Sequence, residues 1–97
     1  MQHMTNRMKD MELIESVVPP LQSTDIELES VEFDEDHHGL DCVWLTFTLA
    51  RIDSDAELPA FARKIKAFSY SATTELLKAG LQAYPHIDYR FTSLKTL

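Results

Sequence analysis

The sequence predicts a small α+β domain, in which a single-layer sheet of about three strands packs against one long helix. Three observations predict it. Residues 42–52 alternate side chains between an apolar and a semi-apolar set, which is typical of a β-strand. Residues 57–80 repeat apolar side chains at three- and four-residue steps, which is typical of an amphipathic helix. Shorter alternating segments at 25–34 and 86–92 predict the strands that complete the sheet.

A first helix is expected from Asn6 to Val18. Thr5 or Asn6 can cap it, because either side chain can accept a hydrogen bond from a free N–H group of the first turn. Pro19 and Pro20 end the helix, since proline has no N–H group to donate. Its apolar side chains recur at helical spacing, at Met8, Met11, Ile14 or Glu15, and Val18.

The strand at 25–34 contains two apolar pairs in opposite phase. A slip of one residue near 29–30 predicts a β-bulge, which would turn both pairs to the same face of the sheet. The alternative is that only residues 30–34 form a strand. The pairs are Ile26 with Leu28 and Val31 with Phe33.

Residues 42–52 form the strongest predicted strand. One of its faces is fully apolar and the other is semi-apolar, so we expect the strand to be central and covered, at least in part, on both sides. The first face consists of Val43, Leu45, Phe47 and Leu49, and the second of Trp44, Thr46, Thr48 and Ala50.

The long helix is expected from about Glu57 to Gly80. A capping box at 54–57, or Pro59 in the first turn, marks its start. Gly80 can end it; otherwise the helix continues until Pro85 stops it. The main apolar stripe consists of Leu58, Phe61, Ala62, Ile65, Phe68, Ala72, Leu76 and Ala79.

The predicted order is therefore helix, strand, strand, helix, strand. The two consecutive strands form an antiparallel hairpin, and the long helix is a right-handed crossover if the last strand lies parallel to the second. This order resembles part of a ferredoxin-like unit. Element by element it is also similar to a KH-type domain, but the Gly-x-x-Gly loop of that family is absent, because Gly39 and Gly80 are the only glycines.

Length and composition fit one domain that spans residues 1–97, with residues 1–5 expected to be disordered or introduced by cloning. No apolar run approaches the roughly 20 residues that cross a bilayer, and no secretory signal is evident, so we expect no membrane contact. Cys42 is the only cysteine, so no intrachain disulfide indicates an oxidising compartment. The expected location is the cytoplasm.

Acidic residues dominate the first part of the chain. The net charge is −7, and residues 1–41 contain only two basic residues, Arg7 and Lys9. Between Asp10 and Ala50 there is no lysine or arginine, and such a surface repels phosphate, so we expect no nucleic-acid partner. Basic residues are more frequent after residue 42, so the two parts could attract opposite parts of a second copy or a protein partner.

A cluster of histidines and acids between the first two strands raises the hypothesis of a metal site. Imidazole, carboxylate and thiolate groups are ligands that zinc accepts. The candidate ligands are His37, His38, Asp36 and Asp41, with Asp34 and Cys42 beside them.

The spacing of these residues favours a simpler interpretation. Neighbouring histidines on a strand point to opposite faces, and none of the familiar metal-ligand motifs is present. Residues 36–39 therefore read as a polar hairpin loop, in which Gly39 supplies a positive φ. Zinc binding by this loop is kept as the less favoured alternative.

No catalytic constellation is evident, so a role other than catalysis is favoured. Asp53 and Asp55 look like paired carboxylates, but acids are common near a helix N-terminus because of its partial positive charge. The hydroxyl residues of the long helix have no histidine near them in the sequence. One helix on a three-stranded sheet also leaves little room for a deep pocket.

A second stripe on the long helix predicts an interface. Exposed apolar and aromatic side chains gathered in one patch often mark protein contacts. Two alternatives compete: the first helix covers the stripe, or the long helix ends at Gly80 and the residues beyond it turn into the core. The predicted interface residues are Tyr70, Leu77, Leu81 and Tyr84.

Three strands leave two open edges, which proteins usually cover, charge or pair. Glu27, Glu29 and Glu32 discourage self-pairing of the first strand, whereas the last strand, with Thr92 and Ser93, is less protected. We therefore expect a twofold homodimer, formed by the last strand or by helix packing on helix.

The function that the sequence favours is a small acidic binding or regulatory module that acts through protein–protein contacts as a homodimer. One alternative is a metal- or small-ligand-binding protein that uses the loop at 34–42. Another is an accessory subunit of an enzyme complex.

Overall fold

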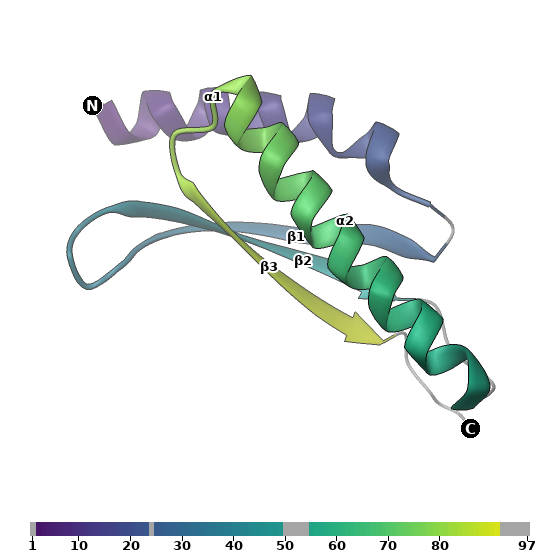
Figure 1. Ribbon diagram of the computed structural model, residues 1–97. Helices are drawn as coiled ribbons and strands as arrows, with labels where there is room; N and C mark the ends of the chain where they lie inside the picture. Colours follow the sequence, from purple (N-terminus) through teal and green to yellow (C-terminus); the bar gives the residue numbers. More distant parts are fainter. Residues whose placement is uncertain (1, 24, 50–54, 92–97) are drawn as a thin grey trace.

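The chain folds in the order that the sequence predicts, and the α+β class is confirmed (Figure 1). The structure is a computed structural model that describes residues 2–23, 25–49 and 55–91. Its elements are α1 (Gln2–Val17), β1 (Ile26–Glu35), β2 (Asp41–Leu49), α2 (Leu58–Ala79) and β3 (Tyr84–Phe91), with the short 3-10 helices η1 (Pro19–Leu21) and η2 (Asp55–Glu57).

The three strands form one mixed sheet with β2 in the centre. β1 pairs with β2 antiparallel and β3 pairs with β2 parallel, so the hairpin and the crossover to a parallel strand are both present. The register of β1 shifts between Leu28 and Ser30, which confirms the predicted bulge. Because of this shift, both apolar pairs of β1 lie on the same face of the sheet as the apolar residues of β2, with which they pair.

Both helices lie on the same side of the sheet (Figure 1). They bury the apolar face of β2, where Val43, Leu45 and Phe47 are fully inaccessible to solvent. The second face of β2 has no helix on it in the described chain. Cys42 is buried there and Thr46 and Thr48 are half-buried, so this face is covered only in part, within the expectation of at least partial cover. The buried residues from the helices and the segments next to them that complete the core are Ile14, Val18, Phe68, Ala72, Leu76, Leu81 and Ala83.

The long helix ends at Gly80, which adopts a φ of 105° that favours glycine. The N–H groups of Gly80 and Leu81 donate to carbonyls of the last helical turn, at 3.1 Å and 3.0 Å. Leu81 then turns into the core and is only 6% exposed. The helix therefore does not continue to Pro85, and the alternative in which it ends at Gly80 is confirmed.

The first helix begins at Gln2 rather than at Asn6, so its first turn includes residues that were expected to lie outside the fold. Its buried residues are Asp10 and Ile14, and Val18, directly after the helix, continues the same four-residue step. Met8, which belongs to the predicted apolar stripe, is instead exposed. The face of α1 that packs on the core therefore differs from the predicted apolar stripe: it includes Asp10 and excludes Met8.

Asp10 is a buried carboxylate with two partners on a distant segment. It is 1% exposed and accepts hydrogen bonds from the backbone N–H groups of Gln82 at 2.9 Å and Ala83 at 2.8 Å. Both N–H groups belong to the loop between α2 and β3. Since a buried carboxylate without such partners is costly, these bonds both satisfy Asp10 and fasten α1 to that loop.

Several predicted features lie outside the described residues. They are the carboxyl end of the second strand at 50–52, Asp53, the capping residue Ser54, and the last-strand residues Thr92 and Ser93. Among the helices of the described ranges, none combines the length and the apolar character that crossing a membrane requires.

Candidate functional site: the open face of the sheet

The clearest candidate surface is the side of the sheet that faces away from α1 and α2, which we call the open face. Alternate side chains of a strand point to opposite faces, and the strand register aligns the outward-pointing residues in rows. The open face comprises Glu27, Glu29, Ser30, Glu32 and Asp34 of β1, Cys42, Trp44, Thr46 and Thr48 of β2, and Tyr84, His86, Asp88 and Arg90 of β3.

Three rings on the open face, those of Trp44, His86 and Tyr84, form what we call the aromatic cluster. Trp44 and His86 are register partners, and their rings stack at 4.5 Å with an interplanar angle of 20°. The Tyr84 ring meets the His86 ring edge-on at 5.2 Å. These are favourable aromatic geometries, so the rings hold one another in place. Trp44 is nevertheless 41% exposed and Tyr84 59% exposed, so the cluster presents apolar surface to solvent.

Carboxylates lie beside the aromatic cluster. Glu32 is directly opposite Trp44 on the neighbouring strand, and Asp34 is opposite Cys42, which in turn pairs with Tyr84. Glu27 and Asp88 add two more acidic side chains to the face. In the described part of the chain, these four carboxylates take no part in an ion pair.

Among the described residues of the open face, one side chain is cationic, Arg90, and it already has a partner. Its guanidinium donates to Glu29 Oε2 at 2.8 Å, and the hydroxyl of Thr48 donates to Glu29 Oε1 at 2.8 Å. Glu29 is the residue at the bulge, so the bulge positions its carboxylate across β2 towards β3. The charge of Glu29 offsets that of Arg90, and the rest of the open face is acidic.

Cys42 belongs to the open face by register but is buried. Desolvation raises the pKa of its thiol, and nearby carboxylates, that of Asp34 first, raise it further. The thiol is therefore protonated at neutral pH and is a poor nucleophile. Its contribution to the open face is that of a small packed side chain.

The loop between β1 and β2 is the polar turn that the simpler interpretation describes. Gly39 has a φ of 81°. The Asp36 carboxylate accepts hydrogen bonds from the backbone N–H groups of Leu40 at 3.0 Å and His38 at 2.8 Å. These bonds lower the pKa of the Asp36 carboxyl group, with the bond from Leu40 contributing most. The carboxylate thus holds the turn together.

The other candidate metal ligands do not converge on one point. The rings of His37 and His38 are neighbours at 4.0 Å, whereas Asp41 pairs with Arg7 of α1 at 3.5 Å on the helix side of the sheet. Within the ranges that the structure describes, no group of three or more histidine, cysteine, aspartate or glutamate residues is arranged to hold a metal ion. Zinc binding by this loop stays an untested hypothesis.

The four predicted interface residues do not share one surface. Tyr70 and Leu77 lie on α2 and are 74% and 46% exposed. Leu81 is in the core, because the helix ends at Gly80, and Tyr84 is on the open face. The predicted continuous stripe therefore shortens to two helix residues, and an interface at Tyr70 and Leu77 stays a prediction.

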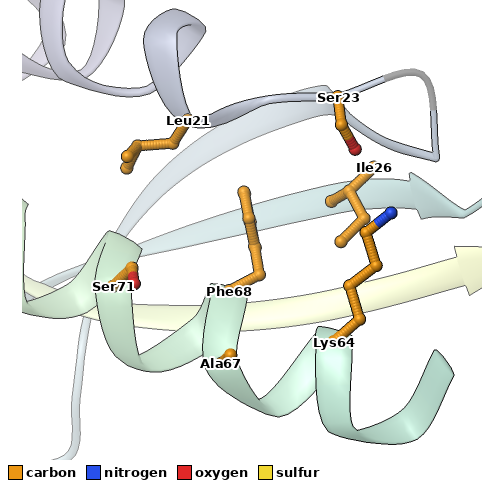
Figure 2. Close-up of a pocket in the computed structure, with 7 residues that line it drawn as sticks. All are labelled: Leu21, Ser23, Ile26, Lys64, Ala67, Phe68 and Ser71. Atoms are coloured by element: carbon orange, nitrogen blue, oxygen red, sulfur yellow. The ribbon is translucent and has the colours of Figure 1, made fainter. Parts of the chain in front are cut away.

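A shallow groove runs between η1 and α2 on the helix side of the sheet (Figure 2). Its volume is about 230 Å³, which is below the range of about 300–1,000 Å³ that is usual for small-molecule sites. Its lysine, Lys64, forms an ion pair with Asp25. The groove therefore offers few free polar groups. It is lined by Leu21, Ser23, Ile26, Lys64, Ala67, Phe68 and Ser71.

Trp44 and His86 are not among the site residues that the sequence predicts. The available signal is the semi-apolar second face of residues 42–52, which the sequence alone predicts to be covered at least in part. His86 is 42 positions further along the chain than Trp44, so only the parallel register brings the two rings together. Knowing which face the helices leave bare requires the tertiary structure.

Comparison with protein-family models, with curated proteins and with solved structures finds no match for this chain. Its function is therefore argued from the open face itself.

Proposed function

We propose that this chain is a small binding module that acts through protein–protein contacts, with the open face as its contact surface. The observation that supports this most directly is the aromatic cluster. Its tryptophan and tyrosine are partly exposed, although the burial of aromatic surface away from water is favourable. Exposed aromatic surface with a polar rim is the usual character of a protein interaction site.

The shape of the surface also favours a protein partner. The open face is built from three paired strands, so it is a broad surface rather than an enclosed cavity. A small molecule is normally held in a concave site that covers most of its surface. A polypeptide can instead lie across the strands and cover Trp44 and Tyr84 together.

The proposal includes a twofold homodimer that pairs β3 with its symmetry mate. β3 is an edge strand, and the other edge strand, β1, carries a row of acidic side chains that would repel a copy of itself. An antiparallel β3 pair centred on Tyr89 would place Asp88 opposite Arg90 of the second copy. Opposite charges at facing positions favour such a pair. This arrangement would leave both open faces accessible.

Sedimentation analysis tests the homodimer. We expect a dimer at about 100 μM, a concentration at which a complex with a micromolar Kd is largely formed. Asp88→Arg alone should weaken the dimer, because it places like charges opposite one another, and the double change Asp88→Arg with Arg90→Asp should restore it. A monomeric wild type, or a double variant that is no better than the single one, would contradict pairing through β3.

Peptide display tests the contact surface. A random peptide library is selected against the wild-type protein, and each enriched peptide is then tested against Trp44→Ala and against Tyr70→Ala. Tyr70 is the matched control, since it is an exposed aromatic residue on the helix side. We expect enriched peptides to lose binding with Trp44→Ala only. If no enriched peptide needs Trp44 for binding, the proposal is wrong.

A further inference from the structure

We propose that the partner of the open face is a basic polypeptide segment that presents arginine side chains to the aromatic cluster. This inference rests on the proposed function and adds the chemistry of the partner. It depends on the juxtaposition of exposed aromatic rings with carboxylates that have no cationic partner in the described chain.

The first argument is the charge of the open face. Glu27, Glu32, Asp34 and Asp88 contribute four negative charges, while the charge of Arg90 is offset by Glu29. The chain as a whole carries a net charge of −7, so the long-range field has the same sign as the local one. Such a field raises the association rate of cationic partners and disfavours acidic ones.

The second argument is the placement of the carboxylates. Directly opposite residues on antiparallel strands have Cβ atoms about 4.5–5.5 Å apart, so the Glu32 carboxylate can lie within reach of a group stacked on Trp44. Asp34 stands in the next row on the same strand, in line with Tyr84. A cation stacked on Trp44 would therefore also meet a carboxylate, whereas Asp34 is separated from Tyr84 by Cys42 of β2.

Arginine fits this arrangement better than lysine. Its planar guanidinium can stack on an aromatic ring and at the same time donate two parallel hydrogen bonds to a carboxylate. The lysine ammonium group is a strongly hydrated point charge that cannot stack in this way. The placement of acidic side chains on β1 beside the exposed ring of Trp44 on β2 thus favours guanidinium groups.

A second copy of the chain is a poor occupant of the open face. Two open faces in contact would bring together two acidic surfaces, on each of which the cationic residue that the structure describes, Arg90, is already paired. Like charges that face each other across an interface raise the free energy of binding by roughly several kcal/mol, so such a pairing is disfavoured. Nucleic acid is disfavoured for the same reason, because phosphates would approach carboxylates.

Trp44 is the only tryptophan of the chain, so its fluorescence reports directly on this site. The probe is a ten-residue peptide with arginine at alternate positions and serine between. Matched peptides carry lysine or glutamate in place of arginine. We expect the arginine peptide to change the Trp44 emission with a Kd about tenfold lower than that of the lysine peptide, and the glutamate peptide to cause no change.

Two matched pairs of substitutions locate the contact. Glu32→Gln with Asp34→Asn removes two charges beside the aromatic cluster, and Glu12→Gln with Glu15→Gln removes two charges from the exposed surface of α1. We expect the first pair to weaken the arginine peptide by about tenfold or more and the second pair by less than about threefold. Far-ultraviolet circular dichroism confirms that both pairs are folded.

Three outcomes would overturn the inference: equal binding of the lysine and arginine peptides, equal loss in the two charge pairs, or binding of free arginine amide as tightly as the peptide. Failure of the proposed function looks different. If display yields Trp44-dependent peptides that are neutral or acidic, the open face is a contact surface but the partner is not basic. If no peptide depends on Trp44, the contact surface itself is wrong.

Discussion

The two faces of β2 differ more than any other two regions of this molecule. Val43, Leu45 and Phe47 on one face are fully buried, whereas Trp44, between two of them, is 41% exposed. The same short strand therefore supplies the centre of the core and the centre of the candidate contact surface. The comparison shows that the face that both helices cover stabilises the fold, whereas the open face, our proposed contact surface, contributes less to the core.

The largest expected effect is on the covered face. Phe47→Ala removes a side chain that is 0% exposed and packs edge-on against Phe68 at 4.9 Å. Truncation of a buried phenylalanine lowers the free energy of unfolding by about 3–5 kcal/mol. Urea unfolding measures it, with Thr46→Ala on the open face as the control. If both variants lost equal stability, the two faces would not differ as described.

Asp10→Ala should have the next largest effect, because it leaves the buried N–H groups of Gln82 and Ala83 without an acceptor. We expect a loss of about 2–4 kcal/mol in the free energy of unfolding. Asp10→Asn should lose less, since its amide can still accept one of the two bonds. Glu12→Ala, an exposed acid on the same helix, is the control and should change stability by less than about 0.5 kcal/mol. A similar loss in both alanine variants would disprove the role of Asp10.

Trp44→Ala sharpens the comparison from the other side. It removes one stacking partner of His86 and a residue with high strand propensity, so we expect a loss of about 1–2 kcal/mol in the free energy of unfolding. Chemical unfolding followed by circular dichroism measures it, because the variant has no tryptophan fluorescence. A loss as large as that of Phe47→Ala would mean that Trp44 is a core residue rather than a contact residue.

The smallest effect is expected at the hairpin loop. The folded-state pKa of Asp36 is lowered by the bonds from Leu40 and His38, so its stabilising contribution is present above the ordinary aspartate pKa and is lost as the pH falls through the folded value. Nuclear magnetic resonance should show the Asp36 carboxyl carbon signal of the wild type changing as the pH falls below the ordinary aspartate pKa. Asp36→Asn should abolish that change, because its amide oxygen accepts the bonds without a charge. An unchanged pH profile in Asp36→Asn would show that another group is responsible.

Local patterns were sufficient for most of the fold. The alternation in 42–52, the phase slip near Glu29 and the stop at Pro19 are all properties of neighbouring residues, so the strand, the bulge and the end of the first helix could be read directly. The end of α2 was left between Gly80 and Pro85. Both residues can stop a helix. The helix ends at Gly80 because burial of Leu81 in the core is more favourable than its exposure on a longer helix.

The candidate site could not be read in the same way. The sequence gives no sign that Asp10 is buried, because its partners, the N–H groups of Gln82 and Ala83, are more than seventy positions away in the chain. The aromatic cluster likewise depends on the parallel register of β2 and β3. Neither arrangement leaves a periodic signal, since each joins residues from separate elements.

The sequence by itself determined which segments are helices and strands and which face of the central strand is most apolar, because both follow from the spacing of side chains along the chain. Only the tertiary structure decided that α1 and α2 share that one face and leave the other bare. The physical reason is that the apolar stripe of α2 and the few apolar side chains of α1, Ile14 above all, bury the most surface by packing on the same fully apolar side. As a result, Trp44, His86 and their acidic neighbours remain exposed to solvent on the opposite side.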